Sequence, residues 1–299
     1  MPILTDPNEA AQRLSDGQLV ALPTETVYGL GGHALNPLSI RQIYAMKGRP
    51  AGHPVIVHLA ADADESKWGT MNAHAHALAT AFWPGPLTLI LPKASHVPDE
   101  VTGGLPTVGI RVPSHPLTQA VLARLNCGIA APSANRFGRI SPTTAAHVTG
   151  EFGPDLAILD GGPCAIGIES TIVDVSRDVP ALLRPGSISK EAIEAIVGPL
   201  GSSSTPAPGT LKSHYAPMTS LHLSTAVETD RIRFEDRGLK VAVLLASEPK
   251  DYAQRLYAEL RRLDQLGVDV LIAETAADSG IGRAINDRLK RASFEFSTD

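Results

Sequence analysis

The amino-acid sequence predicts an α/β protein: a mixed-sheet domain, a linker rich in Pro, Gly and Ser, and a small second α/β domain. Short apolar runs alternate with stretches of helical spacing through the first 200 residues. Residues 198–209 read GPLGSSSTPAPG, which can form neither a helix nor a central strand. Beyond them the alternation returns as strand, helix, strand, helix. We therefore expect a first domain at 1–200, a linker at 201–218 and a second domain at 219–299.

Capping residues mark the first two helices. Asp6-Pro7 opens a helix that Gly17 ends, and Asn36-Pro37 opens another that ends near Lys47. Further helices are expected at 73–82, 116–125, 143–151, 189–197, 251–266 and 281–292. Apolar runs predict strands at 19–22, 55–59, 87–91, 108–112, 129–131, 156–159, 171–175, 181–183, 241–245 and 268–273.

Composition narrows the class of protein. Hydrophobic residues make up 43% of the 299 positions but aromatic residues only 4%, so the core must be aliphatic. The net charge of −5 argues against a broad nucleic-acid surface, although it leaves room for a small basic pocket. Cys127 and Cys164 form neither a disulfide framework nor a zinc site, and we expect two buried free thiols in a reducing cytosol. Without a signal-peptide pattern or a membrane-length apolar run, a soluble cytoplasmic protein is expected.

Two segments carry the groups that a nucleotide triphosphate needs. Lys47 and Arg49 put two cations beside each other, and Arg49 can bind phosphate through two parallel hydrogen bonds. Residues 133–143, SANRFGRISPT, add hydroxyls, an amide and a glycine turn. Cations at a helix C-terminus are often only partners of the helix dipole. The loop that follows and leads into strand 55–59 instead favours a position at the sheet edge.

Other positions leave two interpretations open. Arg111 lies inside an apolar strand and needs an anionic partner, either a protein carboxylate or a substrate carboxylate. His58 lies in an apolar strand, where a lone histidine is more often a core residue than a catalyst, and it has no partner at metal-ligand spacing. Residues 23–31, PTETVYGLG, are interpreted by themselves as a polar strand-to-helix turn. Walker, Rossmann and nucleophile-elbow motifs are absent from the sequence.

Taken together, nine ordered segments resemble the threonylcarbamoyl-AMP synthase family of YrdC-like proteins, in the version with a C-terminal extension. The segments are PTETVYGLG (23–31), KGR (47–49), HPVIVHL (53–59), FWPGPLTLIL (82–91), TVGIRVP (107–113), PSANRFGRISPT (132–143), ESTIVD (169–174), LRPG (183–186) and PGTLKSHYAP (208–217). The resemblance implies a twisted α/β sheet with a concave face that holds ATP and threonine. Phe137 departs from the pattern, because many members carry serine there.

The resemblance also implies an activity. The family makes threonylcarbamoyl-AMP and pyrophosphate from L-threonine, bicarbonate or CO2, and ATP with Mg²⁺. A separate tRNA threonylcarbamoyl transferase then uses the product, so no direct tRNA binding is required. A nucleotidyltransferase without a resident metal is therefore expected, and no membrane partner.

Residue roles follow from the same resemblance. The threonine-contacting residues would be Thr26, His58, Arg111 and Thr171. The catalytic cations would be Lys47 and Arg49. The ATP-contacting residues would be Arg49, His53, Thr107, Ser133, Asn135, Ser141, Arg184 and Tyr215. Tyr215 would lie in a linker segment that closes over the nucleotide.

Two other functions remain as alternatives. A carbamoyl-adenylating enzyme that uses carbamoyl phosphate would share the fold, but the acylphosphatase-like segment and cysteine zinc motifs of such proteins are absent here. A non-catalytic RNA-binding regulator would use the concave cationic face, and the acidic net charge opposes it.

Overall fold

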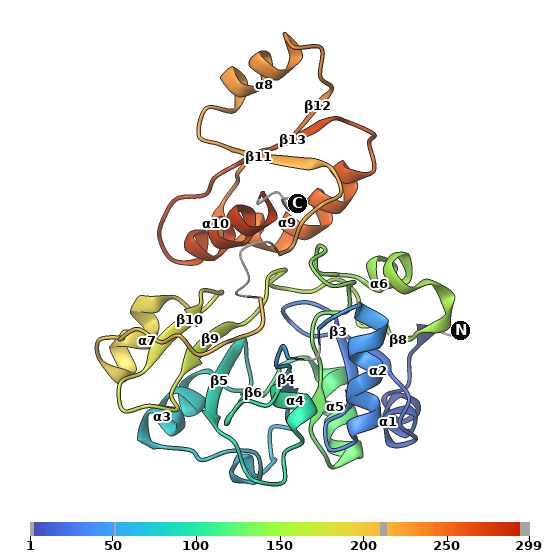
Figure 1. The fold of residues 1–299 in the computed structure, drawn as a ribbon, viewed down its shortest axis with the longest axis vertical. Coiled ribbons are helices and arrows are strands. Elements are labelled where there is room, and N and C mark those ends of the chain that lie inside the picture. Colours follow the sequence, from blue (N-terminus) through green and yellow to red (C-terminus); the bar gives the residue numbers. More distant parts are fainter. Residues whose placement is uncertain (1–2, 51, 210–213, 294–299) are drawn as a thin grey trace.

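A computed structural model of the chain describes residues 3–50, 52–209 and 214–293. It shows a larger domain built on one ten-stranded sheet and a smaller domain built on a three-stranded sheet (Figure 1). The mixed α/β architecture with a second small domain is the fold class that the sequence predicts. Leu, Ile, Val and Ala side chains dominate the interior, as expected from the low aromatic content. No helix in the described ranges is long and apolar enough to cross a membrane.

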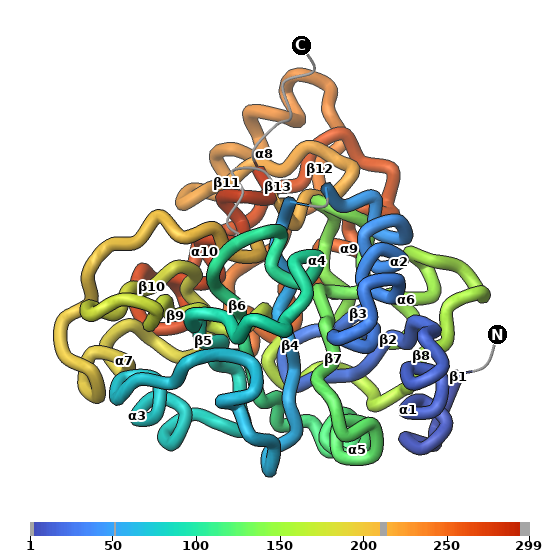
Figure 2. The backbone as a smooth tube through the Cα atoms, turned by 60° about the horizontal axis from the view of Figure 1, so that its bottom comes forward, coloured from blue at the N-terminus to red at the C-terminus, as the bar shows by residue number. Residues whose placement is uncertain are grey.

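The large sheet has the order β1-β8-β2-β3-β7-β4-β6-β5-β9-β10 and mixes parallel with antiparallel pairs. Its strands are β1 Ile3–Leu4, β2 Val20–Leu22, β3 Gly29–His33, β4 Ile56–His58, β5 Leu87–Pro92, β6 Thr107–Arg111, β7 Ile129–Ala130, β8 Ala157–Leu159, β9 Thr171–Asp174 and β10 Ala181–Arg184. Figure 2 shows the central strands β5, β6, β4, β7 and β3 following one another across the molecule. The parallel pairing of β4 with β6 sets His58 beside Arg111.

The helices of this domain are α1 Pro7–Ser15, α2 Pro37–Lys47, α3 Ala73–Phe82, α4 Asp99–Thr102, α5 Pro116–Leu125, α6 Ala145–Phe152 and α7 Lys190–Val197. The first two begin as predicted. The side chains of Asp6 and Asn36 accept backbone N–H groups of α1 and α2, each followed by Pro. Gly48 ends α2 at φ +62°, a left-handed conformation that costs glycine little. This turn directs Arg49 away from the helix axis.

Strand β3 was not expected. The prediction of a strand-to-helix turn over residues 23–31 is wrong, because the chain turns back after Thr26 and β3 pairs antiparallel with β2. The sequence of β3 is GLGGH, and glycine is rare in strand interiors. Here glycine permits close approach, since a Cβ at Gly31 would lie 3.0 Å from the Val20 carbonyl oxygen. The short elements β1 and α4 were also missed.

Residues 198–209 pack against the large domain rather than crossing open space. Gly201 forms a bridge with Ala181 of β10. The hydroxyls of Ser203 and Thr205 donate to the Asp174 carboxylate at 2.6 and 2.7 Å. Ala207 joins an apolar cluster on β4, β5 and β9. The segment predicted as a linker is therefore anchored along the sheet before the chain enters the small domain.

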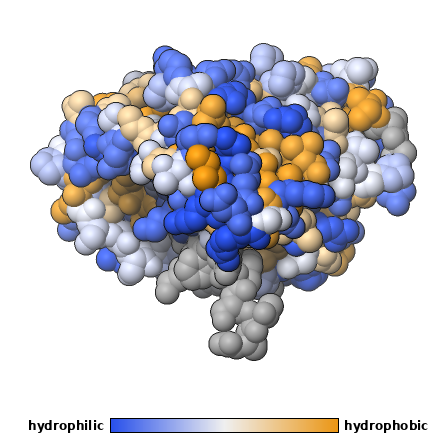
Figure 3. All heavy atoms as spheres, turned by 90° about the horizontal axis from the view of Figure 1, so that it is seen from above, coloured by the Kyte–Doolittle hydropathy of each residue, from blue (hydrophilic) through white to orange (hydrophobic). Residues whose placement is uncertain are grey.

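The small domain has three parallel strands in the order β11-β13-β12. Its elements are β11 Ser220–Ser224, α8 Val227–Glu235, β12 Val241–Leu244, α9 Pro249–Asp264, β13 Val270–Glu274 and α10 Ile281–Ala292. The sequence predicted the last four and missed β11 and α8, a helix that buries none of its side chains. Figure 3, seen from the side of this domain, shows hydrophilic residues with hydrophobic ones scattered among them.

The cysteines agree with the prediction only in part. Both thiols are free, and Cys164 is buried. Burial raises the pKa of Cys164 to about 12. Cys127 is half-buried instead of buried, because it follows the C-terminal end of α5 at the molecular surface.

Candidate active site

A pocket lies between the central strands of the large sheet and the chain that leads into the small domain. Its walls come from the turn before β3, the end of α2, strands β4 and β6, the loop 131–138, and residues 208–209 and 214–215. The cavity volume is only about 50 Å³, because the side chains of Tyr215 and Arg184 pack into it. Binding of drug-sized or larger molecules usually takes a cavity of roughly 300 Å³ or more. Pro208, Gly209, His214 and Tyr215 therefore help to close the pocket in this conformation.

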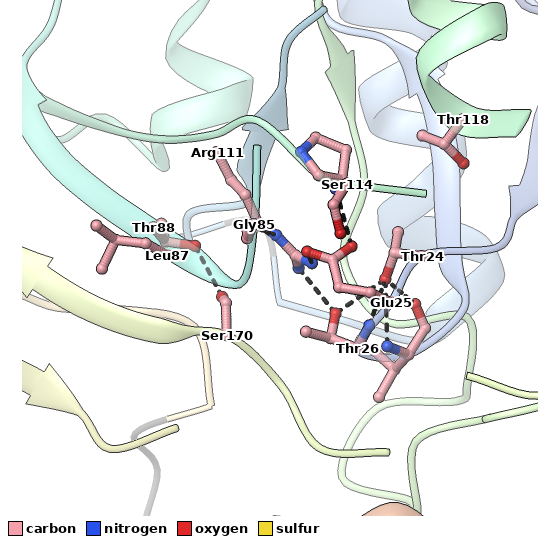
Figure 4. A network of polar contacts seen from close by, with 12 residues as sticks. Thr24, Glu25, Thr26, Gly85, Leu87, Thr88, Arg111, Ser114, Thr118 and Ser170 are labelled. Carbon is pink, nitrogen blue, oxygen red and sulfur yellow. Dashed lines mark hydrogen bonds and ion pairs between the residues drawn. The ribbon is translucent and has the colours of Figure 1, made fainter. Parts of the chain in front are cut away.

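Arg111 stands at the inner end of the pocket and already has a carboxylate partner. Its Nη2 lies 2.8 Å from Glu25 Oε1, and its Nη1 donates to Thr26 Oγ1 at 2.8 Å. Its Nε donates to the Gly85 carbonyl at 3.3 Å. Figure 4 shows Glu25 and Thr26 turned toward the guanidinium from the same loop. The sequence left the partner open, and the structure supplies a protein carboxylate, which fixes the orientation of Arg111.

His58 lies next to Arg111 across the β4–β6 pair and is buried. Burial, reinforced by the neighbouring positive charge of Arg111, lowers the pKa of His58 to about 3. The imidazole is thus neutral near pH 7. Its Nδ1 has no hydrogen-bond partner among the described residues, although it is buried. A buried polar atom without a partner in the protein is a position where a ligand can supply one.

Lys47 and Arg49 enter the pocket from the end of α2, and their residues are only 3% and 8% exposed. Lys47 Nζ donates to the carbonyl oxygens of Ser133 and Asn135. Arg49 Nη2 donates to the Pro54 carbonyl at 2.8 Å, and its guanidinium lies 5.7 Å from the centre of the Phe137 ring. Burial lowers the pKa of both cations. Neither is hydrogen-bonded to a carboxylate in the described part of the chain.

Arg184 forms the opposite wall of the pocket. Its Nε and Nη2 donate to the Ser170 carbonyl at 3.1 and 2.9 Å, and its Nη1 donates to the Pro208 carbonyl at 2.9 Å. Tyr215 lies beside it with 1% exposure and φ +64°, unusual for a residue other than glycine. Arg184 thus ties the anchored segment 198–209 to the start of β9.

Glu169 is a buried carboxylate that sequence reasoning did not identify. Its Oε1 accepts from the Ser141 hydroxyl, and its Oε2 accepts from Tyr257 and Arg288 of the small domain, each at 2.9 Å. Burial by itself would raise the pKa of Glu169, but Arg288 and then Arg184 outweigh it and hold the pKa at about 2. No local pattern could have revealed these partners, which lie 88 and 119 residues further along the chain.

Most of the predicted site residues meet at this pocket. Those that line it are Thr26, Lys47, Arg49, His58, Arg111, Ser133, Asn135, Arg184 and Tyr215. The lining also includes Thr24, Phe137, Glu169, Ser170, Pro208, Gly209 and His214, which were not assigned roles from the sequence. Burial lowers the pKa of His214 to about 3. The roles of all these residues remain predictions.

Four predicted residues lie outside the lining. His53 is half-buried, and its ring centre lies 5.6 Å from that of Phe137. Thr107 begins β6 at the end opposite Arg111, opposite Pro92. Ser141 lies behind Glu169. The hydroxyl of Thr171 donates to the Ile188 carbonyl at 2.9 Å. If these residues contact substrates, the pocket must open first.

Comparisons with known proteins agree with the fold. A family model named Sua5_yciO_yrdC and described as telomere recombination matches residues 12–186, and one described as threonylcarbamoyl-AMP synthase, C-terminal domain, matches residues 188–293. A Bacillus subtilis protein named threonylcarbamoyl-AMP synthase is 41% identical, over 95% of this chain and 92% of its own length. A Thiobacillus denitrificans protein of the same name is 32% identical, over 54% of this chain and 87% of its own length.

A solved structure gives the same result in three dimensions. The crystal structure of Pyrococcus abyssi Sua5 complexed with L-threonine matches with a TM-score of 0.91 at 38% identity. The match covers 96% of this chain and 94% of that one. Both domains and their order are therefore shared with that protein. The chain belongs to the Sua5/YrdC family of threonylcarbamoyl-AMP synthases, in the two-domain form.

Proposed function

We propose that this chain is an L-threonylcarbamoyladenylate synthase. It would join L-threonine, bicarbonate or CO2, and ATP into threonylcarbamoyl-AMP, with release of pyrophosphate, and is thus a nucleotidyltransferase. One observation carries the proposal: a single pocket is lined by an oriented arginine beside a neutral histidine and by three further buried cations. The names of the relatives and the L-threonine complex of a structural neighbour support it.

At the threonine end, the substrate would lie against Thr26, His58 and Arg111. Arg111 would meet the threonine carboxylate, while Glu25 keeps the guanidinium in place. The unpartnered Nδ1 of His58 would accept a hydrogen bond from a substrate N–H or O–H group.

The chemistry is formation of a carbamate followed by its adenylation. The threonine nitrogen forms a bond to the carbon of CO2 and loses a proton to solvent, which gives a carbamate. A carbamate oxygen then forms a bond to the α-phosphorus of ATP as the bond to the β-phosphate oxygen breaks, and pyrophosphate leaves with the electron pair. Both reactants are anionic, so neutralising their charge lowers the barrier most. Lys47, Arg49 and Arg184 would supply this charge.

Mg²⁺ would accompany ATP. Within the described residues there is no group of three or more His, Cys, Asp or Glu side chains that could hold a metal ion. The proposal therefore places Mg²⁺ on the phosphate oxygens, where it would neutralise charge on the leaving pyrophosphate. Lys47 and Arg49 would act beside it at the nucleotide. The product would pass to a separate tRNA threonylcarbamoyl transferase in the cytoplasm.

An omission experiment tests the proposal. Pyrophosphate release from ATP and Mg²⁺ should require threonine and bicarbonate together, because the carbamate is the nucleophile. Reactions that lack one component, or contain serine in place of threonine, serve as controls. Pyrophosphate release without threonine, or turnover that depends on carbamoyl phosphate instead, would contradict it.

A further inference from the structure

The small domain reaches the back of the pocket through two side chains. Arg288 of α10 is fully buried, and its Nε lies 2.9 Å from Glu169 Oε2. Tyr257 of α9 donates to the same oxygen at 2.9 Å. Neither Arg288 nor Tyr257 lines the pocket, whereas Glu169 does. Glu169 is therefore one carboxylate through which the small domain can act on the site.

Two cations interact electrostatically with the Glu169 carboxylate and lower its pKa. Besides Arg288, which is hydrogen-bonded to it, Arg184 is close enough to lower its pKa further. Yet every hydrogen bond that the structure shows for Arg184 goes to a neutral oxygen, on Ser170 or Pro208. The positive charge of Arg184 is thus not compensated by a carboxylate that is hydrogen-bonded to it. Its guanidinium faces the pocket with that charge available to an anion.

We propose that Arg288 is a positioning residue for the nucleotide half of the site: by binding Glu169, it keeps Glu169 from pairing with Arg184. The inference rests on the proposed function, because it takes Arg184 as a phosphate ligand. Its physical basis is competition between two buried cations for one buried carboxylate. Removal of Arg288 alone leaves Glu169 buried and uncompensated, a costly state that pairing with Arg184 relieves.

Arg288 also touches Tyr215, which provides a second way in which it could act. The Arg288 guanidinium lies 5.3 Å from the centre of the Tyr215 ring, and Tyr215 stacks on Tyr257 at 5.8 Å. Loss of these ring contacts would loosen Tyr215 whatever the charge of Glu169. The two explanations predict different results when Glu169 is made neutral. If Arg288 acts through the charge of Glu169, the neutral side chain should restore ATP binding. If Arg288 acts through the Tyr215 ring, it should not.

Three variants separate these explanations. Arg288→Met removes the cation, and the double variant Glu169→Gln, Arg288→Met removes both charges of the pair. Arg283→Met is the matched control, because Arg283 lies on the same helix and pairs across the domain interface with Glu191 at the surface. ATP affinity is measured by calorimetric titration with MgATP in the absence of threonine. KM values for ATP and threonine, and the melting temperature of each variant, complete the set.

Arg288→Met should weaken ATP binding about tenfold or more, the order of a hydrogen bond to a charged group, and change the threonine KM far less. The double variant should regain ATP affinity to within about threefold of the wild type, and Arg283→Met should match the wild type. A folded double variant that still binds ATP as weakly as Arg288→Met would overturn the proposal. So would an equal loss for both substrates, or a loss in Arg283→Met. If Arg288→Met does not fold, a folded double variant that binds ATP about tenfold or more weakly than the wild type overturns the proposal.

The proposed function is tested by a separate result. If the wild type binds MgATP but releases no pyrophosphate with threonine and bicarbonate, the synthase assignment fails while the titrations still report on Arg288. If the wild type turns over normally and the double variant is not repaired, only the role of Arg288 fails.

Discussion

At the scale of single residues, the pocket is defined by how its charges are paired. Arg111 is held by Glu25, whereas Lys47, Arg49 and Arg184 are hydrogen-bonded to carbonyl and hydroxyl oxygens. A buried cation without a hydrogen-bonded carboxylate favours an anionic ligand, because only a ligand can then compensate its charge. The two ends of the pocket are therefore suited to different ligands, an oriented fork for a carboxylate and a group of cations for phosphates.

The first prediction concerns Arg111. Arg111→Ala should weaken threonine binding by about 2–5 kcal/mol, the range for truncating one partner of a buried charge pair, with a much smaller effect on ATP. Arg111→Lys should restore little, because lysine lacks the planar fork. Calorimetry with each ligand measures both losses. Because Glu25 is left unpaired, the double variant Glu25→Gln, Arg111→Met serves as the stability control. Equal losses for the two ligands in a folded variant would assign Arg111 a structural role.

The second prediction concerns the neutral state of His58. Its pKa of about 3 in the folded protein lies below its ordinary value of 6.5, so the unfolded chain binds the proton more readily. Stability is therefore intact above pH 6.5 and declines as the pH falls from 6.5 toward 3. The pKa of His214 is lowered in the same way, so His214 also contributes to the loss of stability as the pH falls. His58→Gln should make the decline of the melting temperature shallower in this range. A decline as steep as in the wild type would contradict a neutral His58.

The sequence indicates cations better than it indicates their partners. Lys47, Arg49, Arg111 and Arg184 stand out because each lies next to an apolar segment or at an element end. Glu169 does not stand out in the sequence, because the residues that bind its carboxylate lie on helices of the small domain. Contacts between residues so distant along the chain leave no periodic or local pattern.

At the scale of elements, short-range signals explain what could be predicted. Helices α1 and α2 begin where a capping side chain and a proline coincide, and apolar runs locate most strands. Strand β3 was not predicted, because its glycines are required by close packing against β2. This tertiary constraint overrides strand propensity. Helix α8 was not predicted, because it lacks an apolar face.

The segment between the domains combines an anchored part and a closing part. Asp174 holds Ser203 and Thr205, while His214 and Tyr215 reach into the pocket. Lys212, a cation of the same segment, lies outside the described residues. Because the cavity of about 50 Å³ is too small for substrates, we expect Pro208, Gly209, His214 and Tyr215 to withdraw and then close over them.

Limited proteolysis tests this expectation. Cleavage within residues 201–216 should be slowed several-fold by ATP plus threonine, because a closed segment buries its backbone. Asp174→Ala should raise the cleavage rate of the free protein by releasing Ser203 and Thr205. If the substrates leave the cleavage rate unchanged, the segment acts only as a connection between domains.

At the scale of the whole molecule, the small domain is part of the pocket's support. Within residues 3–50, 52–209 and 214–293, three ion pairs join the domains: Arg261 with Glu151, Arg283 with Glu191, and Arg288 with Glu169. The first and last are largely buried, and they approach the pocket wall from α9 and α10. The sequence predicted a second domain and its strand–helix order but gave no sign of where it docks, because docking depends on pairs more than 90 residues apart.

A chain ending before Gly209 should fold but lose most activity. All ten strands of its sheet precede Gly209, and a relative named threonylcarbamoyl-AMP synthase matches only 54% of this chain over 87% of its own length. It would also lack Tyr215 and Arg288, so synthase activity should fall about tenfold or more. Circular dichroism checks folding and pyrophosphate release checks activity. Full activity of the truncated protein would show that the small domain does not support catalysis.

The central claim is that one pocket joins threonine, CO2 and the adenylate of ATP. The most direct measurement incubates the enzyme with MgATP, threonine and isotopically labelled bicarbonate, then analyses the products by mass spectrometry. We predict threonylcarbamoyl-AMP that carries the label at its carbamoyl carbon, formed in equal amount to pyrophosphate and strongly reduced by Arg111→Ala. An unlabelled product, or AMP and pyrophosphate formed in the absence of threonine, would contradict the account.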